Sequence, residues 1–258
     1  MERITSKQNA AVVAAAKLSD KKHRERTSTF AFEGIKLFRE ARAAGATLRS
    51  VFVTESAYEK YSKELDPVGE ILFLVSDAVY EKLSFENAPQ GVFCVCDYFV
   101  PRKREESGFV LLLDGVADPG NFGAVLRSAD AFGVDRIYTG AGCADRYNPK
   151  TVRACMGSLF RVEICGSATL AETIATLRSE GFRIYATALD ERSQDIRNVD
   201  LTGKVGFVIG NEGHGVSLAS LNACTGSVII PMREGPESLN AAVASGVVMW
   251  EAARSRLK

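Results

Sequence analysis

Apolar and polar residues follow two different rhythms along the chain, and each rhythm predicts a type of element. Continuous apolar runs such as FVLLLD (residues 109–114) and VGFVIG (205–210) are typical of strands buried on both faces of a parallel sheet. Segments with apolar residues at every third or fourth position, such as residues 168–181, predict helices that bury one face. Strands and helices alternate from residue 108 onward, which predicts an α/β domain with a covered parallel sheet.

The first hundred residues show the same alternation on a smaller scale. Strands are predicted at 28–33, 48–54, 70–76 and 90–99, and helices at 6–18, 34–45 and 77–84. A polar, charged stretch at residues 98–107 separates the two halves and is typical of a linker. We therefore expect a small α/β domain at residues 1–97 and a larger domain at residues 108–258.

Three loops follow predicted strands of the larger domain, at the carboxyl edge where parallel sheets bind ligands. In the first, Asp118, Pro119 and Gly120 form a turn and Asn121 is the predicted helix N-cap. Arg127 lies off the apolar stripe of that helix. It is either an ordinary surface arginine or a side chain that reaches over the helix toward the strand end.

The second and third loops also carry polar residues that allow two interpretations. GNEGHG (210–215) places Glu212 in a glycine-rich loop, as a solvated turn residue or as part of a site. Ser238 is the predicted N-cap of the last helix, and Asn240 lies in its first turn. The apolar stripe of this helix is expected to face the core; it comprises Leu239, Ala242, Val243, Gly246, Val247 and Trp250.

Charge and cysteine content narrow the function classes. The whole chain has a formal net charge of zero, but residues 1–49 hold eleven Lys and Arg against five acids. The cluster at residues 20–30 is either a solvated face or an RNA-binding surface formed by Lys21, Lys22, Arg24 and Arg26. No apolar run suits a signal peptide or a membrane span, and only two His accompany six scattered Cys. We expect a cytoplasmic protein without a metal site or a membrane partner.

The three loops resemble, in order, the three motifs of the SpoU (TrmH-type) RNA ribose 2′-O-methyltransferases. The matching segments are NFGAVLR, IGNEGHG and IIPMREGPESLNAAVA. FAFEGIKLFREA and PQGVFCVC resemble the ribosomal-protein-like substrate-binding domain of that family. The resemblance implies a SPOUT-type α/β domain with a deep trefoil knot, preceded by a smaller α/β domain that binds the RNA substrate.

The resemblance also implies a cofactor, a partner and a set of site residues. The methyl donor would be S-adenosylmethionine, and the protein would be a homodimer with its last helix in the interface. The polar active-site residues would be Asn121, Arg127, Glu212, Ser238 and Asn240. The cofactor pocket would be lined by Thr187, Ala188, Gly210, Asn211, Ile230, Met232 and Leu239.

Ribosomal RNA is the substrate that the resemblance favours, because small members specific for transfer RNA often lack a separate N-terminal domain. Transfer RNA remains an alternative, as does a catalytically idle RNA-binding or ribosome-assembly protein of the same fold. The complete polar set argues against the idle protein. A nucleotide-dependent oxidoreductase is excluded, because no GxGxxG is present. The role of Arg127 stays open between general base and electrostatic stabiliser, since a guanidinium holds its proton at ordinary pH.

Overall fold

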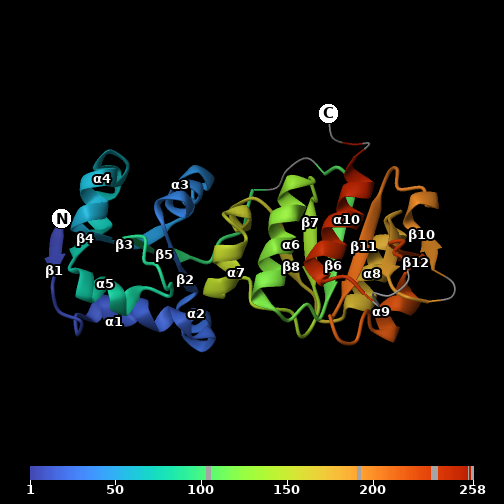
Figure 1. Ribbon diagram of the computed structural model, residues 1–258, viewed down its shortest axis with the longest axis horizontal. Coiled ribbons are helices and arrows are strands. Elements are labelled where there is room, and N and C mark those ends of the chain that lie inside the picture. The colour runs from blue at the N-terminus through green and yellow to red at the C-terminus, as the bar shows by residue number, and fades with distance from the viewer. Residues whose placement is uncertain (103–105, 191–192, 234–237, 255, 257–258) are drawn as a thin grey trace. The chain divides into compact units, whose positions relative to one another are not determined.

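The computed structural model describes residues 1–102, 106–190, 193–233, 238–254 and 256. Part of the expected linker and residues 234–237 of the third motif lie outside this range. The chain forms two compact units (Figure 1). The first comprises Met1–Val100 with Tyr147–Phe160, and the second comprises Pro101–Arg146 with Arg161–Lys258.

The first unit is built on a five-stranded mixed sheet in the order β1-β4-β3-β5-β2. Its strands are β1 (Glu2–Ile4), β2 (Thr29–Glu33), β3 (Leu48–Thr54), β4 (Leu72–Val75) and β5 (Val92–Asp97). Its helices are α1 (Ala10–Ala16), α2 (Lys21–Thr27), α3 (Ile35–Ala44), α4 (Glu55–Leu65), α5 (Asp77–Leu83) and α7 (Pro149–Ala154). The predicted strands and helices of this half are confirmed, whereas β1, α2 and α4 were not predicted.

Residues 147–160 join this first unit, although the sequence pattern grouped them with the second half. Aromatic contacts explain their position. The ring of Tyr147 lies 4.7 Å from that of Phe30 on β2, and Phe160 lies 5.9 Å from Phe32. The Tyr147 hydroxyl also exchanges hydrogen bonds with the backbone of Phe99.

The second unit is a parallel seven-stranded sheet in the order β10-β12-β9-β11-β6-β7-β8. Its strands are β6 (Phe109–Asp114), β7 (Arg136–Thr139), β8 (Glu163–Gly166), β9 (Arg183–Thr187), β10 (Gln194–Asp195), β11 (Val205–Gly210) and β12 (Gly226–Ile229). Its helices are α6 (Pro119–Ala131), α8 (Leu170–Ser179), α9 (Leu218–Ala223) and α10 (Ala241–Ala253). The predicted α/β fold with a parallel sheet is confirmed.

Helices cover both faces of this sheet. Val110 and Leu112 of β6 pack with Leu170 and Ile174 of α8 on one face. On the other face α6 and α10 lie side by side (Figure 1), and α10 also contacts β11. The central strand β6 is therefore buried on both sides, as its continuous apolar run requires.

The orientation predicted for the last helix is wrong. The buried side of α10 carries Ala241, Ser245, Val248, Met249, Ala252 and Ala253. Val243 and Trp250, which were assigned to the core, are 53% and 52% exposed. The helix is apolar on nearly every side, so periodicity alone could not select the buried face. Small residues on the buried side allow α10 to pack closely against α6 and β11, while Val243 and Trp250 stay on the opposite, exposed side.

Candidate active site

The three predicted loops meet at one edge of the parallel sheet. β6, β11, β9 and β12 are consecutive neighbours and run in the same direction, so their carboxyl ends share an edge. The first loop follows β6, the second follows β11, and the segment after β12 leads into α10. The sheet thus brings together residues that lie far apart in the sequence.

Asp118, not Asn121, caps the helix of the first loop. The Asp118 Oδ1 atom accepts a hydrogen bond of 2.7 Å from the Asn121 backbone amide, and Pro119 occupies the first turn. The residue before a proline favours an extended backbone, which is also the conformation of an N-cap. The predicted cap is therefore wrong by three residues. Because the cap lies further upstream, the carboxamide of Asn121 is available for other partners.

Asn240, not Ser238, caps α10. The Asn240 Oδ1 atom accepts hydrogen bonds of 2.9 and 3.3 Å from the amides of Ala242 and Val243. Ser238 is exposed and lies two residues before the cap. Asparagine is among the strongest capping residues, so the sequence offered two adequate caps and the structure uses the later one. The Nδ2 group of Asn240 is not needed for capping.

A chain of three polar side chains links the loops. Asn121 Nδ2 donates to Glu212 Oε1 at 2.7 Å, and Asn240 Nδ2 donates to Asn121 Oδ1 at 3.0 Å. A carboxylate can only accept hydrogen bonds, so Glu212 determines which way the Asn121 amide points. The Asn121 Oδ1 atom then faces Asn240, so Asn240 must present its donor, Nδ2, to it. We call this Glu212–Asn121–Asn240 arrangement the polar relay.

The glycine-rich loop that carries Glu212 is held closed by its neighbour Asn211. The backbones of Asn211 and Gly215 exchange two hydrogen bonds, of 3.0 and 2.9 Å. The Asn211 side chain donates to Gly115 O at 2.8 Å and accepts from the amides of Gly213 and His214. Asn211, expected to contact the cofactor, thus uses its side chain to fix the loop against the end of β6.

Two residues of this edge were missed by sequence reasoning. The Asp114 Oδ2 atom, at the end of β6, accepts hydrogen bonds from the Ser217 amide and hydroxyl at 2.9 and 2.7 Å. Ser217 also caps α9. Asp114 could have been identified from the sequence, because it is a carboxylate at the end of a continuous apolar run. This contact ties the exit of the glycine-rich loop to the first loop.

Arg127 lies on the exposed side of α6. Its guanidinium makes no hydrogen bond or ion pair with any residue in the described part of the chain. Gly123, one turn earlier, is buried. The structure therefore does not join Arg127 to the polar relay within this chain, and its side chain is accessible to an RNA ligand.

The basic cluster of the first unit needs one correction. Arg24 is only 1% exposed, and its Nη1 atom donates to Leu18 O and Ser19 O at 2.7 and 2.8 Å. Buried in this way, it supports the helix and does not present a charge to RNA. Lys21 and Lys22 are exposed, and Arg26 lies on the surface with its Nη2 atom 2.8 Å from His23 Nδ1. A surface hollow beside them adds Lys17 and Lys82.

The described residues show no metal cluster, no disulfide and no membrane-spanning helix. No group of three or more His, Cys, Asp or Glu side chains in that part of the chain is arranged to hold a metal ion. All six cysteines have free thiols. No described helix combines the length and the hydrophobicity needed to cross a membrane.

Comparison with known proteins assigns the chain to a family. The profile of the SpoU rRNA methylase family matches residues 108–250, the region that contains all three loops. The chain belongs to the SpoU rRNA methylase family. The profile of the MRM3-like substrate binding domain matches residues 9–94. The family resemblance seen in the three motifs is confirmed.

Relatives of known activity cover nearly the whole chain. It is 31% identical to the 23S rRNA (guanosine(2553)-2′-O)-methyltransferase RlmP of Bacillus subtilis, over 97% of this chain and 98% of RlmP. An AdoMet-bound rRNA methyltransferase from Sinorhizobium meliloti superposes with a TM-score of 0.88 at 29% identity, covering 100% and 99% of the two chains.

The AdoMet complex of AviRb from Streptomyces viridochromogenes superposes with a TM-score of 0.82 at 28% identity, over 97% and 99% of the chains. The protein is accordingly an S-adenosylmethionine-dependent RNA 2′-O-methyltransferase.

The residues at the carboxyl edge fit S-adenosylmethionine. Thr187 ends β9, Gly210 ends β11, and Ile230 follows β12, so the three come from adjacent strands. Met232 and Leu239 are 36% and 37% exposed and present apolar surface. Apolar side chains combined with loop backbone suit a ligand that has a flat ring and a charged tail. Thr187 Oγ1 and the Ala188 amide already donate hydrogen bonds to the neighbouring strands. The cofactor would therefore be contacted by other backbone groups of the loops and by apolar side chains.

Proposed function

We propose that this enzyme methylates a ribose 2′-oxygen of ribosomal RNA. The polar relay is the observation that carries the proposal, because it joins residues from all three motifs at the edge where the cofactor-lining residues lie. An idle protein would have no need to keep this arrangement. Similarity to RlmP over nearly the full length of both chains supports ribosomal RNA over transfer RNA.

The bound cofactor supplies a methyl group already activated by the positive charge of a sulfonium. The side chains must then align the 2′-oxygen and remove its proton. Glu212 Oε1 is held by Asn121, and because the Glu212 side chain is exposed, its carboxylate can accept the proton of the 2′-hydroxyl. Arg127 remains cationic and stabilises the negative charge that develops on the 2′-oxygen or holds a phosphate. Ser238, exposed next to the third loop, contacts the ribose.

The RNA-binding surface of the first unit comprises Lys17, Lys22, Arg26 and Lys82, which line the hollow, and the exposed Lys21 beside it. These side chains lie in the region matched by the MRM3-like substrate binding domain. Their contact with RNA is through phosphates, which makes the affinity depend on salt concentration. The domain boundaries that go with this role are residues 1–97 for RNA binding and 108–258 for methyl transfer, except that residues 147–160 pack with the first unit.

The protein acts in the cytoplasm as a homodimer, with the exposed face of α10 in the interface. Val243, Val247 and Trp250 are 53%, 37% and 52% exposed on this face, an apolar surface that a second copy would cover. The deep trefoil knot belongs to the same proposal. It is supported by the path of the chain, which must return from β12, past β9 and β11, to reach α10 beside α6.

One experiment tests the chemistry and the substrate together. Purified protein is incubated with methyl-labelled S-adenosylmethionine and separate pools of unmodified ribosomal and transfer RNA. The expected result is label in the ribosomal pool, released as a 2′-O-methyl nucleoside. Label in the transfer RNA pool alone would overturn the proposed substrate. An assembled ribosomal subunit serves as a third substrate. If the protein binds the cofactor but labels neither RNA pool nor the assembled subunit, the result would favour the idle protein.

A further inference from the structure

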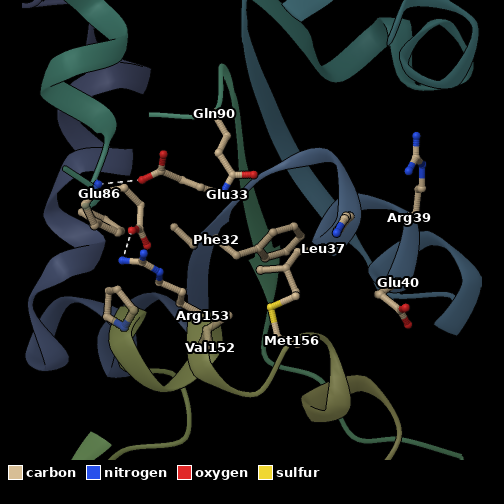
Figure 2. Close-up of a pocket in the computed structure, with 14 residues that line it drawn as sticks. Phe32, Glu33, Leu37, Arg39, Glu40, Glu86, Gln90, Val152, Arg153 and Met156 are labelled. Carbon is tan, nitrogen blue, oxygen red and sulfur yellow. Dashed lines mark hydrogen bonds and ion pairs between the residues drawn. The ribbon is translucent and has the colours of Figure 1, made fainter. Parts of the chain in front are cut away.

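The first unit contains a pocket of about 370 Å³ that the methyl-transfer site does not use. It lies between β2 with α3, the segment after α5, and α7 (Figure 2). Its lining combines residues 31–40 and 85–90, matched by the MRM3-like substrate binding domain, with residues 149–156, matched by the SpoU family. Two regions far apart in the sequence therefore build one cavity.

One side of the pocket is apolar and ends in an exposed methionine. Phe32, Leu37 and Val152 are buried in its wall, whereas Met156 is 44% exposed. Figure 2 shows Met156 opposite Phe32 and Leu37, with its sulfur directed toward them. Met156 has a φ of 49°, a left-handed conformation that a side chain of this size rarely adopts. The turn holds a flexible, polarizable side chain at the pocket mouth, where a flat ring could pack against it.

The other side of the pocket is lined by polar side chains, of which Glu33 is held in place by hydrogen bonds. The Glu33 carboxylate is 8% exposed and accepts hydrogen bonds from Tyr80 Oη, Ser84 Oγ and the Phe85 amide at 3.1, 2.9 and 2.6 Å. Burial raises the pKa of the Glu33 carboxyl, and these hydrogen bonds partly offset the effect. Gln90 lies beside it, over Gly34, where a Cβ atom would be only 2.4 Å from Gln90 Oε1. A carboxamide offers a donor and an acceptor together, as the edge of a nucleobase does.

The rim of the pocket carries three cationic side chains, Lys36, Arg39 and Arg153, and three carboxylates, Glu33, Glu40 and Glu86. Arg39 pairs with Glu64, and Arg153 pairs with Glu86. Lys36 is exposed, and no described residue forms an ion pair with it. A positive charge beside an apolar slot with hydrogen-bonding groups suits a ligand that carries a phosphate next to a flat ring.

We propose that this pocket binds one unpaired base of the RNA substrate. The base packs between Met156 and Phe32, its edge faces Glu33 and Gln90, and its phosphate lies beside Lys36. Proteins that read RNA commonly capture single-stranded bases in this way, by packing on the ring and hydrogen-bonding the edge. The proposal rests on RNA being the substrate, and it adds a base-reading contact to the phosphate contacts of the basic surface.

Methyl groups of methionine provide a direct test, because the chain has four methionines. Protein labelled with ¹³C-methyl methionine is titrated with each nucleoside 5′-monophosphate, with a single-stranded RNA of about ten nucleotides, and with ribose 5-phosphate. The Met156 signal, assigned with Met156→Leu, is expected to shift with at least one nucleotide and with the RNA. It is expected to stay in place with ribose 5-phosphate. An equal shift with ribose 5-phosphate would make this a phosphate site and overturn the base pocket.

Two variants separate the pocket from general effects on folding. Met156→Gly removes the apolar side chain at the pocket mouth, and glycine suits the left-handed backbone, so the variant should keep its fold. We expect it to bind RNA about fivefold more weakly or worse. Lys36→Glu should also weaken binding, whereas the matched variant Lys63→Glu, an exposed lysine on α4, should not.

The outcomes also distinguish this proposal from the proposed function. S-adenosylmethionine should shift the signal of Met232, which follows β12, and leave that of Met156 in place. If label reaches ribosomal RNA while Met156 responds to no nucleotide and both pocket variants bind RNA like Lys63→Glu, the base pocket is wrong and the methyltransferase assignment stands. If no RNA is methylated but Met156 shifts with RNA, the pocket stands and the proposed reaction fails.

Discussion

Replacing Gly210 with alanine should impair binding of S-adenosylmethionine. Gly210 ends β11 and begins the glycine-rich loop. A Cβ atom there would lie 2.2 Å from the carbonyl carbon of Gly215 and 2.3 Å from the amide nitrogen of Val216. Both are backbone atoms, so they cannot turn aside as the end of a flexible side chain could. The loop must change its course to accept even one methyl group.

The magnitude follows from how firmly the loop is held. Normal contacts need more than an ångström of extra space, and the loop is fixed by two backbone hydrogen bonds between Asn211 and Gly215 and by Asn211 Nδ2 on Gly115. Introducing an atom into such tightly packed structure costs about 1–3 kcal/mol. If the enzyme relieves this strain by giving up the loop conformation that binds the cofactor, the affinity falls by about 5- to 150-fold.

Calorimetric titration with S-adenosylmethionine measures this loss, and Gly226→Ala is the matched control. Gly226 begins the nearby strand β12, where a Cβ atom would meet Tyr185 at 3.8 Å, an ordinary contact. We expect Gly226→Ala to bind the cofactor like the wild type. Wild-type affinity in Gly210→Ala would refute the reasoning, because the loop would then not need its present course to bind. An equal loss in both variants would point to general damage to the sheet.

Four further results are expected. Asn240→Asp should keep the α10 cap and change the unfolding free energy by less than about 0.5 kcal/mol, yet reduce methyl transfer by about 100-fold. Arg127→Ala should reduce transfer by at least about 100-fold without changing cofactor affinity in calorimetry, and near-normal turnover would contradict its assignment. Val243→Asp combined with Val247→Asp should convert the dimer to a monomer in sedimentation, and a persistent dimer would place the interface elsewhere. The raised pKa of Glu33 means that the folded state binds the extra proton, so the unfolding free energy should fall as the pH rises above 4.5, and Glu33→Gln should lack this component in urea titrations.

The carboxyl-edge site was predictable because its signals are local. Buried parallel strands are recognisable as continuous apolar runs, and a polar or glycine-rich segment directly after such a run lies at the ligand-binding edge. Glu212, Asn121 and Asn240 were singled out in this way, and the family resemblance then implied their role in the active site. The hydrogen bonds between them were not predictable, because each depends on the strand order β12-β9-β11-β6, which the sequence pattern does not contain.

The errors arose where local pattern leaves two choices and tertiary packing decides. Arg24 lies in a run of charged residues, most of which face solvent. Nothing in the sequence of that run shows that the Arg24 guanidinium donates hydrogen bonds to the carbonyls of Leu18 and Ser19. Likewise, α10 is apolar on most sides, and the small residues on one face allow it to pack closely on the sheet. Residues 147–160 belong to the first unit because Tyr147 and Phe160 pack against Phe30 and Phe32. The local sequence pattern does not predict these contacts.

The two misplaced helix caps explain how the polar relay is built. Asp118 accepts a hydrogen bond from the Asn121 amide in the first turn of α6, which releases the carboxamide of Asn121 from capping. Asn240 caps α10 with its oxygen alone and keeps its Nδ2 group for Asn121. Capping and site chemistry therefore use different atoms of the same helix ends, and Glu212 fixes the direction of every hydrogen bond between them. Such an arrangement is preorganised before any ligand arrives, which is the condition under which polar groups contribute most to a reaction. It also means that stability and methyl transfer can be separated at Asn240, since aspartate supplies the capping oxygen but not the donor.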